Sequence, residues 1–159
     1  MSNDHRKREI NPAIGAMMRQ ARDFLAHEHS LFSTMNIEPV LIGRGKTSFG
    51  VDLPAAFAGP DGRIHSSLLT IVLDSMLGIT VFTALDKLAP IATVNLRTDY
   101  LATAEAGKRA VCSATCIDVS NEIARVNGEL RLEDNNELLA VASGAFMVGT
   151  RGPAPGSRL

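Results

Sequence analysis

Residues 64 to 85 read IHSSLLTIVLDSMLGITVFTAL, and this stretch decides the fold of the chain. Apolar side chains recur here on nearly every side of a helix, and Pro90 follows soon afterwards. The pattern predicts a helix from His65 to about Leu88, roughly 35 Å long, that is buried on nearly all sides. Asp74 lies near its middle, where a charge would be costly in a bilayer, so we expect a core helix and no membrane span.

Strand-like alternation follows Pro90 and also precedes the helix. Four segments after the proline have a period of two, namely residues 91–102, 110–119, 123–132 and 138–148. In the first segment, alternation places on one face Ala92, Val94, Leu96, Thr98 and Tyr100, and on the other Thr93, Asn95, Arg97 and Asp99. Residues 37–53 predict a strand pair that turns at Gly43 and Gly45, before a loop over 54–63.

The predicted elements combine into one α+β domain. Strands joined by short turns form an antiparallel meander. A long apolar helix needs cover, so the economical arrangement is a curved antiparallel sheet wrapped around one central helix. We expect an N-terminal segment over 1–35, with an amphipathic helix from about Pro12 to Glu28, then the main domain over 36–149 and a flexible tail over 150–159.

Composition excludes several classes of function. The formal net charge of -1 argues against nucleic acid as a partner, because binding its backbone needs a concentrated positive face. Cys112 and Cys116 lie in one predicted strand about 13 Å apart, which is too far for a disulfide. No Cys or His spacing matches a metal site, so we expect none. The first residues do not show the basic, apolar and small-residue segments of a signal peptide in that order, and we expect a cytoplasmic protein.

Asp74 is the residue that a purely structural interpretation does not explain. It is the only charged residue between His65 and Leu85, in a helix that we expect to be enclosed. No basic residue lies three or four positions away to pair with it. Ionised carboxylates are rarely buried without a partner, so Asp74 either reaches the surface or a backbone amide, or it is a functional acid.

Three residues around Asp74 add a pattern. His65 opens the predicted helix, Asp74 follows nine positions later, and Gly78 comes shortly beyond. Together with the strand-forming run TVNLRTDYL over 93–101 and the glycine at 107, this pattern resembles the PaaI-type hotdog thioesterases over about residues 36–149. The resemblance implies the hotdog fold and hydrolysis of an acyl-CoA thioester, with no cofactor except the coenzyme A of the substrate.

The resemblance also implies roles for individual residues. Asp74 would be general base or nucleophile, the backbone N–H of Ser66 at the helix start would stabilise the developing oxyanion, and His65 would fix the loop or the substrate. Thr93 matches a hydroxyl residue at the start of the next strand. By alternation it lies on the polar face, opposite Val94, so it would reach Asp74 only through local twist or from a partner subunit.

Two groups of residues are candidates for substrate binding: positions where this chain differs from the family pattern, and basic residues. The family carries two glycines where this chain has Ser66 and Ser67, and an Asn where it has Gly59, with Asp61 nearby. Arginine and lysine side chains would hold the phosphates of coenzyme A, and the candidates are Arg97, Lys108, Arg109 and Arg151. In the family the site lies between subunits, so the resemblance implies a homodimer or homotetramer.

Other interpretations stay open at this point. A non-catalytic hotdog module would bind an acyl-CoA or another small apolar ligand without hydrolysis. A hotdog dehydratase would pair a loop histidine with a helix acid, although the spacing of His65 and Asp74 suits a thioesterase better. A purely structural oligomer would leave Asp74 without a purpose. Neither the acyl group nor the carrier, coenzyme A or acyl-carrier protein, follows from the sequence.

Overall fold

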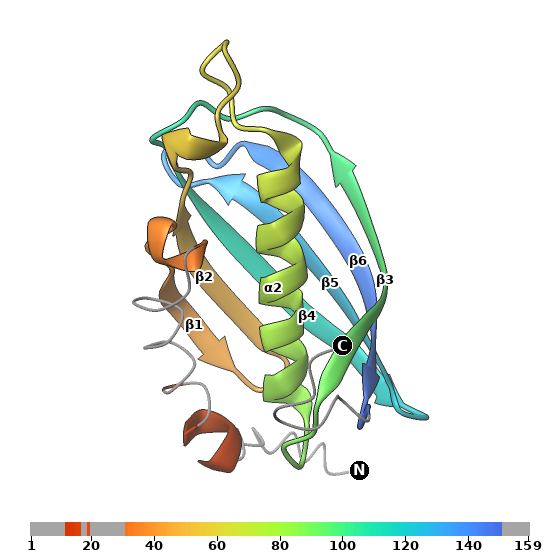
Figure 1. The fold of residues 1–159 in the computed structure, drawn as a ribbon. Coiled ribbons are helices and arrows are strands. Elements are labelled where there is room, and N and C mark those ends of the chain that lie inside the picture. Colours follow the sequence, from red (N-terminus) through yellow and green to blue (C-terminus); the bar gives the residue numbers. More distant parts are fainter. Residues whose placement is uncertain (1–11, 17–18, 20–30, 151–159) are drawn as a thin grey trace, which may run out of the picture.

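The computed structural model describes residues 12–16, 19 and 31–150, and within them one antiparallel sheet dominates. Its six strands lie in the order β1-β2-β4-β5-β6-β3, so β1 and β3 form the two edges (Figure 1). The strands are β1 (Glu38–Gly43), β2 (Lys46–Asp52), β3 (Ile91–Tyr100), β4 (Arg109–Ser120), β5 (Ile123–Leu132) and β6 (Leu138–Val148). Two short 3-10 helices, η1 (Phe32–Thr34) and η2 (Ala55–Phe57), flank the β1–β2 hairpin.

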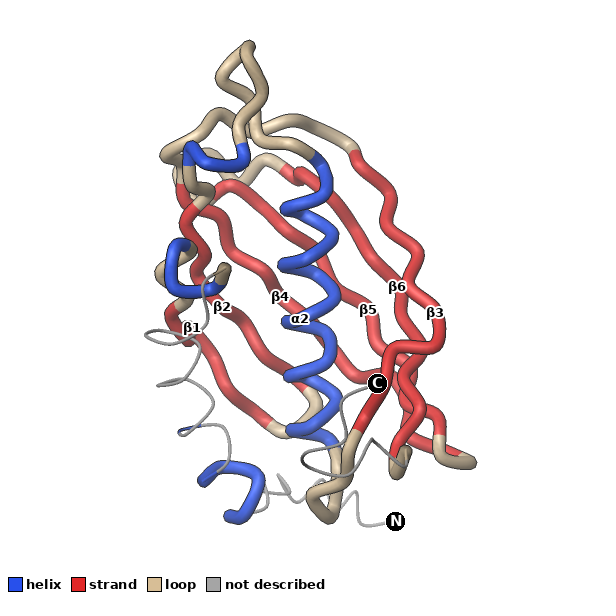
Figure 2. The backbone as a smooth tube through the Cα atoms, viewed as in Figure 1, coloured by secondary structure: helices blue, strands red, loops and turns tan. Residues whose placement is uncertain are grey.

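The long helix α2 (Ser66–Ala84) crosses one face of this sheet, and the strands curve around it (Figures 1 and 2). The predicted hotdog architecture is therefore confirmed. Leu68, Val72, Leu73, Met76 and Leu77 of α2 are buried with the inward-facing residues of the strands. By length and hydropathy α2 is the one helix of the described part that could cross a membrane, yet it is packed here as a core helix.

Close contact between α2 and the sheet depends on a glycine and on threonines. A Cβ at Gly128 of β5 would lie 2.5 Å from a terminal methyl carbon of Leu77, so a larger residue there would force the Leu77 side chain to move. Thr80 donates to the carbonyl of Met76 at 2.8 Å and pairs with the Thr47 hydroxyl at 2.6 Å, where both side chains are buried. These bonds fix the second half of α2 over β2.

The helix ends earlier than its apolar pattern predicts. It stops at Ala84, not near Leu88, because Leu85 adopts an extended conformation and keeps its side chain in the core. At the other end the structure describes helical residues at 12–16 and 19, which agrees with the predicted start of an N-terminal helix at Pro12. The remainder of that prediction, up to Glu28, and the tail beyond 150 lie outside the described residues.

The prediction that α2 is buried on nearly all sides is wrong for one side of the helix. A single sheet covers one face, so an opposite strip stays half-exposed; it comprises Thr70, Ile71, Asp74, Ser75, Ile79 and Phe82. Asp74 is therefore neither enclosed in the core nor fully in solvent. Ile71, Ile79 and Phe82 make much of this strip apolar, which is unusual for a surface that remains in water.

A β-bulge changes the facing of residues in β3. Thr93 pairs with Phe146 of β6 and Asn95 pairs with Ala145, so Val94 is an extra residue without a partner. The bulge means that Thr93 faces α2, as Leu96 does three residues later, while Val94 is 58% exposed. The alternation that we predicted for Thr93 and Val94 is wrong for this reason, although it holds from Leu96 onward.

Candidate active site

Asp74 and Thr93 meet where the middle of α2 passes the edge strand. The Thr93 hydroxyl donates a hydrogen bond of 3.0 Å to Oδ1 of Asp74. This contact joins a helix residue to a strand residue nineteen positions later within one chain, so the local twist at the bulge suffices and no partner subunit is needed. The bond fixes one carboxylate oxygen, and the half-exposed position leaves the group accessible to water or substrate.

More hydroxyl groups lie along the border between α2 and β3 toward the start of α2. We call this border, from the Asp74–Thr93 pair to the Thr70–Tyr100 pair, the hydroxyl seam. Thr70, one helical turn before Asp74, bonds through its hydroxyl to that of Tyr100 at the end of β3. Between the two pairs, Oγ1 of Thr98 is buried and has no hydrogen-bond partner among the described residues. Sequence analysis missed this row, but the spacing of four residues from Thr70 to Asp74 is a signal that marks one face of a helix.

The first turn of α2 is capped by a histidine side chain. Nδ1 of His65 accepts the backbone N–H of Ser67 at 3.2 Å, and it lies 2.8 Å from the Ser67 hydroxyl. The N–H of Leu68 bonds to the carbonyl of His65, whereas that of Ser66 has no acceptor among the described residues. The helix N-terminus thus presents one uncommitted N–H group, at Ser66, together with its partial positive charge.

The loop before α2 is held by its own hydrogen bonds. Gly59 donates to the carbonyl of Arg63 at 2.8 Å, and the Asp61 carboxylate accepts the Arg63 backbone N–H at 3.1 Å. Gly62 has φ +75°, which favours glycine. At its end the His65 N–H bonds to the carbonyl of Phe57. Gly59 and Asp61 therefore shape the approach to the helix start.

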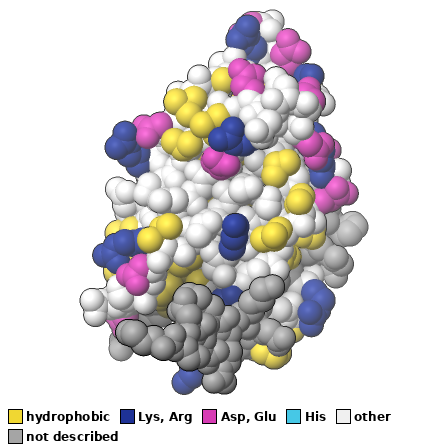
Figure 3. Space-filling model, turned by 180° about the vertical axis from the view of Figure 1, so that it is seen from behind, with side chains coloured by type: hydrophobic (Ala, Val, Ile, Leu, Met, Phe, Trp, Pro, Cys, Tyr) yellow, Lys and Arg dark blue, Asp and Glu magenta, His cyan; other side chains and the backbone are white. Residues whose placement is uncertain are grey.

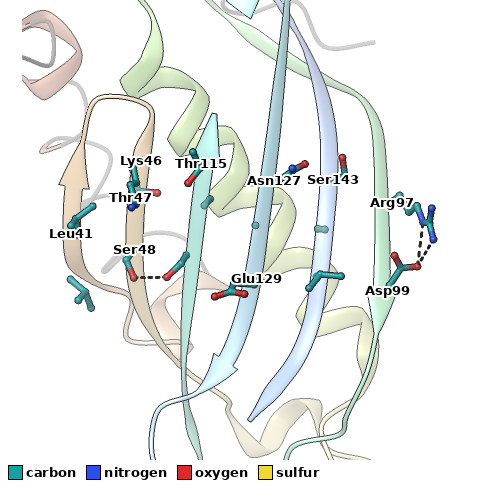
Figure 4. Close-up of a pocket in the computed structure, with 16 residues that line it drawn as sticks. Leu41, Lys46, Thr47, Ser48, Arg97, Asp99, Thr115, Asn127, Glu129 and Ser143 are labelled. Atoms are coloured by element: carbon teal, nitrogen blue, oxygen red, sulfur yellow. Dashed lines mark hydrogen bonds and ion pairs between the residues drawn. The ribbon is translucent and has the colours of Figure 1, made fainter. Parts of the chain in front are cut away.

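The basic candidates that the structure describes, Arg97, Lys108 and Arg109, are paired with acids other than Asp74. Arg97 pairs with Asp99 on the outer face of β3, opposite α2 (Figure 4). Lys108 contacts Asp134 at 2.6 Å, and this hydrogen bond raises the pKa of the Lys108 ammonium. Arg151 lies outside the described residues.

Arg109 joins four segments of the chain. Its guanidinium contacts Asp52, Glu38 and Glu133, and the hydrogen bond that Arg109 donates to Asp52 raises the pKa of Arg109. It lies over Gly50, where a Cβ would stand 2.5 Å from a guanidinium nitrogen. This arrangement ties the β1–β2 hairpin to β4 and commits the charge of Arg109 to protein carboxylates.

The outer face of the sheet carries an open hollow of about 860 Å3, separate from Asp74. Its floor consists mainly of small and polar side chains such as Ser48, Ser113, Asn127 and Ser143 (Figure 4). Acidic and basic groups are intermixed over this face, without a positive patch (Figure 3). The face carries none of the acids and hydroxyls of the Asp74 seam.

Neither cysteine is suited to act as a nucleophile. Burial raises the pKa of the Cys112 thiol to about 12, so it stays protonated near neutral pH. Burial also raises the pKa of Cys116. Among residues 12–16, 19 and 31–150, no three His, Cys, Asp or Glu side chains gather as metal ligands. The chemistry available at the seam is therefore that of a carboxylate supported by hydroxyl groups.

Comparison with known protein families gives a match over the part of the chain that contains the candidate site. The family model of the thioesterase superfamily matches residues 61–139, from the loop before α2 into β6. The chain belongs to the thioesterase superfamily. The matched region contains His65, Ser66, Asp74 and Thr93 and spans both ends of the hydroxyl seam. No curated protein sequence matches the chain.

Solved structures show that this superfamily member shares its fold with distant relatives. Zebrafish thioesterase superfamily member 2 aligns with a TM-score of 0.74 and 15% identity, over 85% of this chain and 97% of that one. A phenylacetic acid degradation-related protein of Ralstonia eutropha JMP134 aligns at 0.71 and 23%, over 85% and 98%. A hypothetical thioesterase of Streptococcus pneumoniae TIGR4, solved with coenzyme A, aligns at 0.66 and 14%, over 74% and 92%.

Proposed function

We propose that this protein hydrolyses acyl-CoA thioesters to the free acid and coenzyme A. The observation that carries the proposal is the Asp74 carboxylate, held by the Thr93 hydroxyl at a half-exposed seam of a thioesterase-superfamily fold. The coenzyme A in the streptococcal structure supports this carrier over an acyl-carrier protein. The reaction needs no metal or cofactor beyond the coenzyme A of the substrate.

The spacing along α2 supports a site shared between two copies of the chain. Ser66 and Asp74 lie eight residues apart, which is about 12 Å along a helix. A carbonyl oxygen on the Ser66 N–H would hold its carbon far beyond the reach of Asp74 in the same helix, even through one water. In our proposal Ser66 of one subunit and Asp74 of the other act on one thioester.

The edge strand β3 is where the second copy would pair. Its outer backbone groups have no neighbouring strand among the described residues, and apolar side chains are exposed in β3 at Val94 and Tyr100 and just after it at Leu101. Pairing of β3 with its symmetry mate would continue the sheet and bring each Asp74–Thr93 pair close to the other subunit. The edge strand β1 also exposes apolar residues, but it lies at the far side of the sheet from Thr93.

The proposed reaction moves one proton twice, first to Asp74 and then to the thiolate, while one C–O bond forms and one C–S bond breaks. Asp74 accepts a proton from water as the oxygen attacks the thioester carbon, and the Ser66 N–H stabilises the oxyanion. Collapse breaks the C–S bond, and the departing thiolate takes up the proton. Direct attack by Asp74 would instead form a mixed anhydride that water hydrolyses.

A substrate panel with a carboxylate variant tests the proposal. Purified protein is given short, long and aromatic acyl-CoAs while free thiol is followed. Asp74→Asn should keep the fold and lower kcat roughly 100-fold or more. Asp118→Asn, an exposed acid on β4, is the matched control and should retain full activity. Wild-type hydrolysis by Asp74→Asn would disprove the mechanism, and tight acyl-CoA binding without thiol release would assign a binding module.

The oxyanion donor has its own test, because Ser66 is the first residue of α2. Proline is well tolerated at this position and has no N–H, so Ser66→Pro deletes the donor and keeps the helix. His65 already has φ -68° and ψ 137°, which suits a residue before proline. We expect kcat to fall roughly 100-fold in Ser66→Pro, whereas Ser66→Ala keeps the N–H and the activity. Equal activity of the two variants would reject the role of Ser66.

A further inference from the structure

The first turn of α2 is held by the imidazole of His65, whose Nδ1 accepts a hydrogen bond only when it carries no proton. Ser67 directs two groups at Nδ1 of His65, its backbone N–H at 3.2 Å and its hydroxyl at 2.8 Å. An N–H can donate only to an unprotonated Nδ1, so the ring in this arrangement is neutral, with its proton on Nε2. Most N-caps are Ser, Thr, Asp or Asn, whose acceptor oxygens do not titrate near neutral pH.

Protonation of His65 would remove this cap. The new Nδ1–H would face the Ser67 N–H, which places two donors against each other. A positive ring would also lie at the positive end of the helix dipole. Both effects drive the imidazolium away from the helix start, and the first turn loses the bond that fixes Ser67.

Other charged groups near the helix start are committed elsewhere. The loop before it carries Asp61, which accepts from the Arg63 backbone, and Arg63, which donates to the Thr103 hydroxyl. The neighbouring segment carries Glu105, whose backbone forms an isolated β-bridge with that of Arg63 and whose negative charge acts on the Lys108 ammonium. No contact joins these three side chains to the imidazole within the described residues. Ser67 is thus the group through which the charge of His65 acts on the helix.

We propose that neutral His65 is a positioning residue that holds the Ser66 N–H in place for catalysis, and that its protonation releases this donor. The inference rests on the proposed thioesterase function. His65 acts through the backbone of the first helical turn, so it need not touch the substrate. The thioesterase would then lose activity in acid because an oxyanion donor moves, separately from any protonation of Asp74.

The structural part is tested by NMR without substrate. As the pH is lowered, the signals of the His65 ring nitrogens and of the Ser66 and Ser67 amides should shift together, with one midpoint. In His65→Asn, whose amide oxygen caps but does not titrate, the two amides should not shift. The double variant His27→Asn/His29→Asn keeps His65 and should titrate like the wild type. Amides that stay still while the His65 ring titrates would overturn the proposal.

The kinetic part uses the same variants. Wild-type kcat should fall in acid with the midpoint of the amide signals, and in His65→Asn this fall should move to lower pH. His65→Ala should lose roughly 10- to 100-fold in kcat with little change in KM, while His65→Asn stays within about threefold of wild type at pH 8. If His65→Asn is as inactive as His65→Ala, the imidazole itself is required and the positioning role is wrong.

The two proposals fail in different ways. If the wild type hydrolyses no acyl-CoA but the Ser66 and Ser67 amides follow the His65 ring, the helix start responds to pH and the proposed thioesterase function is wrong. If hydrolysis occurs and the amides do not follow, the function stands and the role of His65 falls.

Discussion

Asp74 gains its orientation from one hydroxyl group on a neighbouring strand. The bond from Thr93 leaves one carboxylate oxygen for water, and the half-exposed site gives that water access. A base must hold its oxygen within hydrogen-bond reach of the proton that it removes. In the proposed mechanism Thr93 is a positioning residue, whose contribution would depend on its hydroxyl and not on its size.

Substitutions at Thr93 separate these two properties. Thr93→Val keeps the shape and removes the donor, so we expect kcat to fall roughly 10- to 100-fold as the carboxylate loses its orientation. Thr93→Ser keeps the donor and should retain most activity. Steady-state kinetics on the best acyl-CoA, with circular dichroism as a check of folding, measures both. A fully active Thr93→Val variant would mean that the contact with Asp74 has no catalytic role.

At the scale of elements, α2 is joined to β2 by a buried polar contact. Thr80 donates to Met76, so its oxygen accepts from the Thr47 hydroxyl, and both side chains are out of solvent. Removal of one partner leaves the other buried hydroxyl unsatisfied. Removal of both leaves two apolar groups of similar shape, which is much less costly. The pair is therefore expected to be strongly coupled.

A double-mutant cycle measures this coupling. Thr80→Val should lower the free energy of unfolding by about 1–3 kcal/mol. The double variant Thr47→Val/Thr80→Val should lose less than the sum of the single variants. Urea denaturation of the four proteins gives the coupling energy. If the losses add, the hydrogen bond between helix and strand contributes nothing beyond packing.

The elements themselves were largely predictable, since periodicity is a local property. The bounds of β5 and β6 match the predicted strands, and α2 begins one residue after the predicted start. The bulge at Val94 was not predictable, because it arises from the register of β3 against β6. Likewise, the carboxylates around Arg109 come from three separate segments, and no spacing in the sequence reveals them.

At the scale of the whole molecule, the described residues leave apolar surface uncovered along one border. The half-exposed strip of α2 and the outer side of β3 share this border, where the Asp74–Thr93 pair also lies. Because unpaired edge strands invite pairing, a second copy at β3 would cover the strand and complete the proposed site together. The other edge, β1, offers a comparison within the same molecule.

A lysine substitution on each edge strand tests which of the two edges pairs with a second copy. Val94 on β3 is 58% exposed and Val40 on β1 is 64% exposed, so lysine fits either position in the monomer. Val94→Lys should shift the protein toward monomers and reduce activity, because like charges would meet across the two-fold axis. Val40→Lys should change neither property. Light scattering gives the molar mass of each variant, and thiol release at the same protein concentration gives its activity. A dimer that survives Val94→Lys would exclude pairing at β3.

Complementation between two inactive chains tests whether each site draws on both subunits. Asp74→Asn lacks the acid and keeps the oxyanion donor, whereas Ser66→Pro has the opposite defect. In a mixed dimer, one site would combine the intact Ser66 N–H of the first chain with the intact Asp74 of the second. Half of randomly paired dimers are mixed and each has one restored site, so activity should recover to about a quarter of wild type. Refolding the two chains together from denaturant and assaying thiol release measures this recovery. Activity that stays at the level of the separate variants would place both residues of a site in one chain, which the 12 Å or so between them along α2 argues against.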